Sequence, residues 1–148
     1  YYMYIQLYRG VALFVPFFIE AANEKHEKLL SIFCASNNMN FSILKSSKRK
    51  KLHLAAVASN NFTYHLLSMV KEYCIKNEVN FKDLKPLLEK TIEAALNEDS
   101  FVEQTGPARR GDNTLIEKQV KELKEFENLQ EIYEIFTKQI IKKHHHEL

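Results

Sequence analysis

The longest helical pattern in the chain lies near its middle, between residues 46 and 77. Neither Gly nor Pro occurs between Lys51 and Cys74, as suits the interior of a helix. Apolar side chains recur there at steps of three and four, on one face of a helix: Ala55, Ala58, Phe62, Leu66, Met69 and Tyr73. A second, more polar face has the same spacing: His53, Val57, Asn61, Tyr64 and His65. The pattern predicts either a central core helix with satisfied polar groups or a helix that lines a substrate cleft.

The first 45 residues show shorter, strand-like patterns around one helix. Weak alternation over Tyr2–Tyr8 and the apolar run at Phe17–Glu20 predict two strands, and Phe41–Leu44 predicts a third. Between them, Asn23 is placed to cap a helix that continues to about Ser36. This order is typical of the end of a βαβ sheet, and alone it would leave an unpaired edge.

The rest of the chain has only helical patterns. A helix opening at Asn80 or Phe81 has a stripe of leucines and runs to about Asn97. Thr114 and Glu117 have the spacing of a capping box, which predicts a helix through about Phe126. A last helix opens at Asn128. The pattern therefore predicts a mainly α protein with about five helices, in which a short α/β segment comes first.

Composition places the chain among ordinary soluble domains. It has 148 residues, of which 45% are hydrophobic and 27% charged, enough for a sizeable core. A net charge of +2 is too small to indicate a nucleic-acid partner, and the apolar run at Val11–Ile19 is too short to cross a membrane. The basic run at residues 45–51 is either a phosphate-binding edge or a solvated turn. Cys34 and Cys74 fit no metal spacing and are expected to be buried free thiols in a reducing, cytoplasmic compartment.

Glycine is scarce, and this excludes two common nucleotide motifs. With only three glycines, neither a G-x-G-x-x-G fingerprint nor a phosphate loop can be written. The tail at residues 144–148 holds three consecutive histidines, which cannot readily converge on one ion from a helix. We expect no metal site there, and a disordered tail or a tag remnant instead.

The loop between the predicted helices carries the strongest chemical signal. Residues 104–112 read QTGPARRGD and hold two of the three glycines. Gly106-Pro107 predicts a turn, and Arg109, Arg110 and Asp112 follow it before a helix start. Helix N-terminal N–H groups beside an arginine favour a phosphate or carboxylate. The alternative is a well-capped loop whose arginines pair with Glu residues.

Two of these stretches, KSSKRKKLHLAAVASNNFTYHL and QTGPARRGD, with the lead-in VPFFIEAANEKHEKLL, resemble a known bacterial group. They are similar to the C-terminal domain of unknown function of Rossmann-type NAD(P)-dependent oxidoreductases, over about residues 15–141. That domain is similar to the helical C-terminal domains of 6-phosphogluconate dehydrogenase relatives. The resemblance implies a helical dimerisation and substrate domain at 46–143, preceded at 1–45 by the end of a Rossmann-like sheet.

The resemblance also carries over individual positions. His53, Asn61 and His65 match polar positions of the family's long helix, and it implies that they face the cleft. The loop positions that match are Thr105, Gly106, Pro107, Arg110 and Asp112. Tyr64 departs from the pattern, which would have an asparagine there. In an intact enzyme His53 or His65 could be the proton donor or orienter beside a reducible carbonyl or imine, which Asn61 could hold. Arg110, with Arg109 beside it, could bind an acidic substrate group.

These observations lead to one main hypothesis and one rival. The main hypothesis is the substrate-binding and dimerisation domain of an NAD(P)-dependent oxidoreductase, without the nucleotide-binding half and inactive alone. It predicts no cofactor in this chain, with NAD(P) implied for an intact family member, a homodimer, and a small anionic substrate. The rival is a non-catalytic helical interaction module that uses its apolar faces only to dimerise.

Overall fold

The computed structural model describes residues 16–97 and 104–145, and the chain divides into two compact units. The first unit ends at Asn61 and the second begins at Phe62. This division falls later than the domain boundary expected after residue 45.

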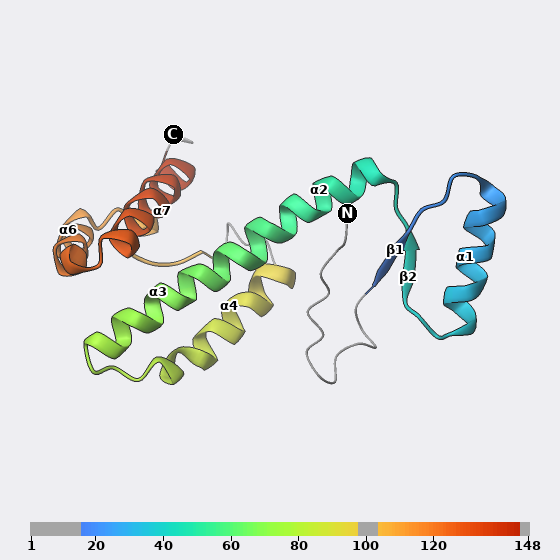
Figure 1. Cartoon of the computed structure of the whole chain (residues 1–148). Coiled ribbons are helices and arrows are strands. Elements are labelled where there is room, and N and C mark those ends of the chain that lie inside the picture. Colours follow the sequence, from blue (N-terminus) through green and yellow to red (C-terminus); the bar gives the residue numbers. More distant parts are fainter. Residues whose placement is uncertain (1–15, 98–103, 146–148) are drawn as a thin grey trace. The chain divides into compact units, whose positions relative to one another are not determined.

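A small βαβ arrangement opens the first unit. Strand β1 (Phe17–Ile19) pairs in parallel with β2 (Phe41–Ile43), and Phe17 lies opposite Phe41 in the register. Helix α1 (Glu24–Ser36) connects the strands and lies beside them (Figure 1). Its N-terminus is capped as predicted, because the side chain of Asn23 accepts a hydrogen bond from the His26 N–H at 3.0 Å. The strand predicted at residues 2–8 lies outside the described residues.

The long helix predicted from Ser46 is present, with one irregularity. Helix α2 (Ser46–Ala56) leads into a π-helical stretch (Val57–Asn61), which leads into α3 (Phe62–Lys76). In a π-helix the hydrogen bonds span five residues rather than four, so the 3.6-residue period is interrupted there. The two faces predicted from a uniform period therefore do not continue unchanged through this stretch.

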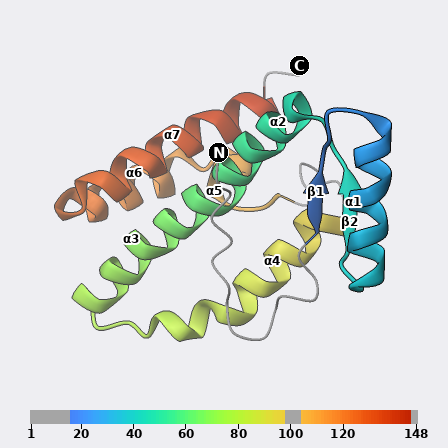
Figure 2. The same ribbon diagram turned by 45° about the vertical axis from the view of Figure 1, so that its right-hand side comes forward.

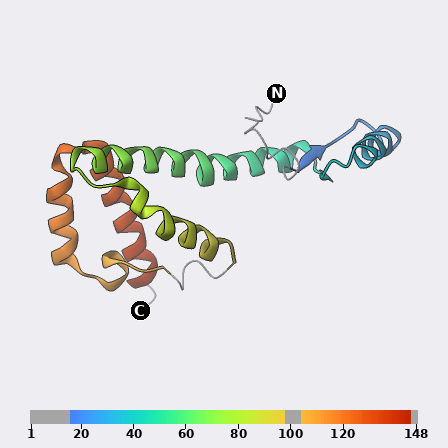
Figure 3. The same ribbon diagram turned by 90° about the horizontal axis from the view of Figure 1, so that it is seen from below.

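The second unit is entirely helical in its described part. After α3 come a 3-10 turn η2 (Phe81–Leu84), α4 (Lys85–Asn97), α5 (Pro107–Arg110), α6 (Asn113–Glu122), a 3-10 turn η3 (Leu123–Glu125) and α7 (Glu127–His145). Helices α6 and α7 run side by side (Figure 3), and α7 also contacts α3 and α5. Tyr73 of α3 meets Phe126 edge to face, with 5.0 Å between ring centroids. The mainly helical fold with a short parallel sheet at its start confirms the predicted fold class.

Helix α4 is the least covered element of the second unit. Its main neighbour is η2, the turn that precedes it (Figure 2). Three of its apolar side chains are largely exposed: Leu87 at 62%, Ile92 at 52% and Leu96 at 79%. The predicted leucine stripe is therefore formed, but the described residues of this chain leave it facing solvent.

The start of α6 and the end of α7 both differ from expectation. The predicted capping box at Thr114 is wrong, because the α6 cap is Asp112, whose Oδ1 accepts from the Leu115 N–H at 3.1 Å. Gly111, in the left-handed conformation, ends α5 and brings Asp112 to that position. At the other end, α7 includes His144 and His145, which were expected in a disordered tail.

Candidate functional site

The loop at residues 104–112 forms a tight corner built around α5. Pro107 opens α5, where its missing N–H has no helical partner to lose. Gly106 has a φ of 109° and Gly111 a φ of 68°, a region that side chains disfavour. The two glycines therefore flank α5 and turn the chain on either side of it. The turn predicted at Gly106-Pro107 is confirmed, whereas the helical turn after it was not foreseen.

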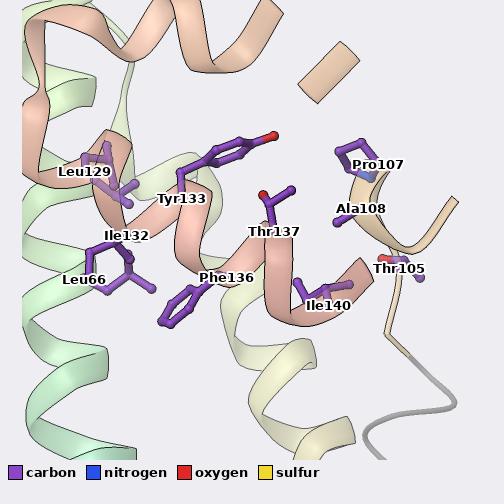
Figure 4. Close-up of a pocket in the computed structure, with 12 residues that line it drawn as sticks. Leu66, Thr105, Pro107, Ala108, Leu129, Ile132, Tyr133, Phe136, Thr137 and Ile140 are labelled. Carbon is purple, nitrogen blue, oxygen red and sulfur yellow. The ribbon is translucent and has the colours of Figure 1, made fainter. Parts of the chain in front are cut away.

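Helix α5 packs on α7 through two small side chains. Ala108 of α5 is only 6% exposed and Thr137 of α7 only 8%. Figure 4 shows Thr137 on the face of α7 that looks toward Pro107 and Ala108. Small residues at both positions let the two backbones approach closely, so the loop is held against α7.

Beside this contact lies an open pocket of about 280 Å³, lined by residues of α3, α5 and α7 (Figure 4). Its walls are mainly apolar: Leu66, Val70, Thr105, Gly106, Pro107, Ala108, Leu129, Ile132, Tyr133, Phe136, Thr137 and Ile140. A mainly apolar cavity with few polar groups is typical of small-molecule sites. This pocket is therefore the strongest candidate site in the second unit.

Three side chains bring polar atoms to the pocket. The Tyr133 hydroxyl is already used, because it donates to Oε1 of Gln119 on α6 at 2.6 Å. Thr105 is exposed at the rim, and Thr137 lies at the contact with α5. None of the described residues that line the pocket is charged. Its chemistry is thus that of an apolar cavity with hydroxyl groups.

The predicted loop residues divide into three groups. Thr105 and Gly106 line the pocket. Arg109 donates to the carbonyl of Gln104 at 2.5 Å and so braces the corner, while Asp112 caps α6. Arg110 is exposed; its backbone N–H donates to the Gly106 carbonyl at 3.2 Å, while its guanidinium makes no hydrogen bond or ion pair to another residue of the described part. The structure therefore leaves Arg110 as the loop arginine that can reach a ligand.

Two tail histidines brace the same corner. His144 lies 3.0 Å from Oε1 of Gln104 through its Nε2, and His145 lies 2.8 Å from the carbonyl oxygen of Arg109. These contacts give a physical reason why α7 continues to His145. They also mean that the end of α7 helps to position the loop.

The predicted catalytic residues are all exposed and line no described pocket. His53 belongs to α2, Asn61 closes the π-helical stretch, and His65 lies on α3. The nearest polar partner of Asn61 is the Asn60 amide at 3.5 Å, a weak contact. The interpretation of these residues as satisfied polar groups of a buried core is therefore wrong for this chain. Their catalytic roles stay a prediction.

Sequence reasoning missed a polar cluster in the first unit. Glu20, directly after β1, accepts hydrogen bonds from the Ser46 hydroxyl and from Nη2 of Arg49, the latter at 2.7 Å. Hydrogen bonds from the Ser46 side chain and backbone, followed by the charge of Arg49, hold the pKa of Glu20 below its ordinary value of 4.5. The sequence did contain one signal for this cluster. Ser46 and Arg49 are three residues apart at a helix start, so their side chains lie on the same face of the helix.

Thr137 was also missed. Its neighbours Tyr133, Phe136 and Ile140 on α7 also line the pocket. Thr137 is next to Phe136 in sequence, and a lone Thr in a helix has no distinctive pattern. Only the packing of α5 against it marks the position.

The described residues form neither a metal-ligand cluster nor a membrane-spanning helix. No group of three or more His, Cys, Asp or Glu side chains gathers there to hold a metal ion. None of the helices in residues 16–97 and 104–145 is long and apolar enough to cross a membrane. Both cysteines are buried free thiols, as predicted.

The sequence matches one described family. Residues 15–140 match the family model described as Domain of unknown function (DUF2520). The chain belongs to this family. The resemblance inferred from the two motifs is thereby confirmed, and it covers most of the chain.

A solved structure supports the same assignment. The chain is 31% identical to a Bacteroides fragilis protein whose crystal structure is described as a "putative NADP oxidoreductase", with a TM-score of 0.78. The match covers 86% of this chain and 49% of that one, so this chain spans about half the length of its relative. No curated protein matches the sequence.

Proposed function

We propose that this chain is the helical substrate-binding and dimerisation domain of an NAD(P)-dependent oxidoreductase. The observation that carries the proposal is the likeness to the Bacteroides fragilis protein, at 31% identity over 86% of this chain. Half of that relative has no counterpart here. The proposal therefore assigns the cofactor to a part of an intact protein that this chain does not supply.

The described residues do not fit a nicotinamide dinucleotide. In a Rossmann site, a glycine-rich turn after a parallel strand lets the backbone approach the pyrophosphate. Here the turn between β1 and α1 reads Glu20-Ala21-Ala22-Asn23, with no glycine and with a carboxylate that would repel phosphate. A bound nicotinamide would supply the hydride in an intact protein.

Substrate binding is proposed at the loop that carries Arg110. The exposed guanidinium can pair bidentately with a carboxylate or phosphate. Of the three candidates for the proton-transfer machinery, His65 belongs to the same unit as this loop, whereas His53 and Asn61 belong to the first unit. For an intact enzyme, the proposal makes His53 or His65 the proton donor or orienter beside a reducible carbonyl or imine, which Asn61 holds.

The exposed apolar helices support dimerisation. Leu87, Ile92 and Leu96 on α4 are more than half exposed, as are Leu29, Ile32 and Phe33 on α1. Apolar stripes of this kind mark interaction surfaces. We propose that a second copy of the chain covers them, in a reducing cytoplasm that suits the two buried thiols.

Anion binding distinguishes the proposed function from the rival interaction module. Thermal melts would be recorded with and without succinate and inorganic phosphate, for the unmodified chain, Arg110→Ala and the control Lys118→Ala, which removes an exposed cation from α6. We expect the anions to raise the melting temperature by about 3 °C in the unmodified chain and in Lys118→Ala, and not in Arg110→Ala. A dimer that no anion stabilises would support the interaction module instead.

A further inference from the structure

We infer that the pocket between α3, α5 and α7 binds a small neutral molecule that has an apolar body and one hydroxyl or carbonyl group, and that the Thr137 hydroxyl recognises this group. The inference goes beyond the anion site proposed at Arg110, because Arg110 does not line the pocket. It rests on the pocket walls and on an unpaired hydroxyl.

The walls determine the apolar part of the ligand. Leu66 from α3, Ile132, Phe136 and Ile140 from α7, and Pro107 from α5 surround the space (Figure 4). Phe136 is 46% exposed, so part of its ring faces water. Covering such a surface with apolar atoms is favourable in proportion to the area removed from water. At about 280 Å³ the pocket is near the lower end of ligand sites, which indicates a ligand of roughly one ring.

Thr137 provides the polar anchor. It is 8% exposed, and its hydroxyl makes no hydrogen bond to any residue of the described part. Other helical hydroxyls in the chain behave differently: those of Ser31, Ser68 and Thr91 each donate to the carbonyl four residues earlier. A hydroxyl that makes no hydrogen bond inside the protein is left to pair with water or with a ligand.

The Thr137 oxygen is accessible from the pocket. No side-chain oxygen or nitrogen in the described part is both fully enclosed and unpaired. The Thr137 oxygen therefore keeps some contact with open space, and Thr137 is one of the residues that line the pocket. A hydroxyl both donates and accepts, so it can pair with an alcohol or with a carbonyl.

The absence of charge from the pocket lining selects a neutral ligand. Among the described residues that line it there is no Lys, Arg, His, Asp or Glu, so an ionised group would lose its hydration without a partner from these walls. A second copy of the chain is a poorer occupant than such a ligand. Its exposed leucines would fill the walls but leave the Thr137 hydroxyl unpaired.

The test compares benzyl alcohol, toluene and benzoate as probes of the whole chain, with binding followed by two-dimensional NMR. We expect benzyl alcohol and toluene to shift the signals of Ile132 and Ile140, and benzoate to leave them unchanged. In Thr137→Val, which keeps the shape but removes the hydroxyl, the Kd of benzyl alcohol should rise about 5- to 10-fold while that of toluene stays constant. Thr137→Ser should restore benzyl alcohol binding.

Thr91→Val is the matched control, because it removes an exposed helical hydroxyl that bonds only to its own helix. It should leave both dissociation constants unchanged, and so should Arg110→Ala, so that a failed anion site is distinguished from a failed pocket. If benzyl alcohol shifts no pocket signal, including the case in which a second copy covers the pocket, the inference is overturned. An equal effect of Thr137→Val on benzyl alcohol and toluene would overturn it too.

Discussion

The guanidinium group of Arg49 lies 2.7 Å from the carboxylate of Glu20 and joins the first turns of α2 to the end of β1. Arg49 also donates to the Leu44 carbonyl at 3.1 Å, just after β2. One side chain thus ties together the carboxyl ends of both strands. The sequence predicted that the basic run at residues 45–51 is either a phosphate-binding edge or a solvated turn. For Arg49, one cation of that run, the structure shows a third role, as a link between the two strand ends.

The lowered pKa of Glu20 predicts a loss of stability in acid. A carboxyl group whose pKa is lower in the folded than in the unfolded chain stabilises the fold at pH values above its unfolded pKa. That contribution is lost as the pH falls through the folded pKa, so the loss should begin below about pH 4.5. Urea denaturation between pH 3 and 7 should show a steeper acid loss in the unmodified chain than in Glu20→Gln.

Ser46→Ala should reduce the same acid dependence, because it removes the first cause of the shift. Ser47→Ala is the control, since the Ser47 hydroxyl takes no part in this cluster. Identical pH profiles for the unmodified chain and Glu20→Gln would refute the assignment.

The cap of α6 can be tested by a matched pair of substitutions. Asp112→Ala should lower the free energy of unfolding by about 1 kcal/mol, because the Leu115 N–H loses its acceptor. Thr114→Ala, inside the helix, should change it by less than about 0.5 kcal/mol. Denaturant titration of both variants measures the difference. A larger effect at Thr114 would restore the capping box predicted from the sequence.

Asn61→Leu should be nearly neutral for stability. Asn61 is exposed and makes only one weak side-chain contact, so we expect a change within about 0.5 kcal/mol. As a contrast, Ala108→Leu places extra volume at the buried α5–α7 contact and should cost about 1–3 kcal/mol. Thermal melts of both variants measure these two changes in stability. A loss of several degrees for Asn61→Leu would indicate a buried structural role.

A dimer held through α4 should dissociate when its stripe becomes charged. We expect the unmodified chain to sediment at micromolar concentration with twice the 17.4 kDa mass of one chain, across an interface of about 2,000 Å². Leu87→Glu combined with Leu96→Glu should yield monomers. Lys90→Glu, an exposed polar change on the same helix, should leave the dimer intact. A 17 kDa species alone in the unmodified sample would rule the dimer out.

The chain by itself should not bind a nicotinamide cofactor. The turn after β1 has no glycine through which a pyrophosphate could approach the backbone. Titration of NADPH followed by its fluorescence should show no saturable change. A Kd below about 10 μM, equivalent to roughly 7 kcal/mol of binding, would contradict the proposal that the cofactor binds to another part of an intact protein.

Local chemistry alone determined most of the elements of this protein. Asn23 caps α1, and Pro16 precedes β1. Residues 46–77 contain no glycine, which favours a long helix. Each of these features depends only on residues that are neighbours in the sequence. The two motifs similarly sufficed to indicate the family, since they are contiguous stretches of residues.

Tertiary structure decided what these elements do. The sequence pattern could not show that π hydrogen bonding interrupts the helical period at Val57–Asn61, or that Asp112 rather than Thr114 caps α6. Nor could it show that Glu20 pairs with Arg49, because the two residues are 29 positions apart and lie on separate elements. The burial of Ala108 and Thr137 was equally hidden, because these residues belong to different helices. Burial and pairing depend on which surfaces meet in space, and helical periodicity specifies a face of an element without specifying its partner.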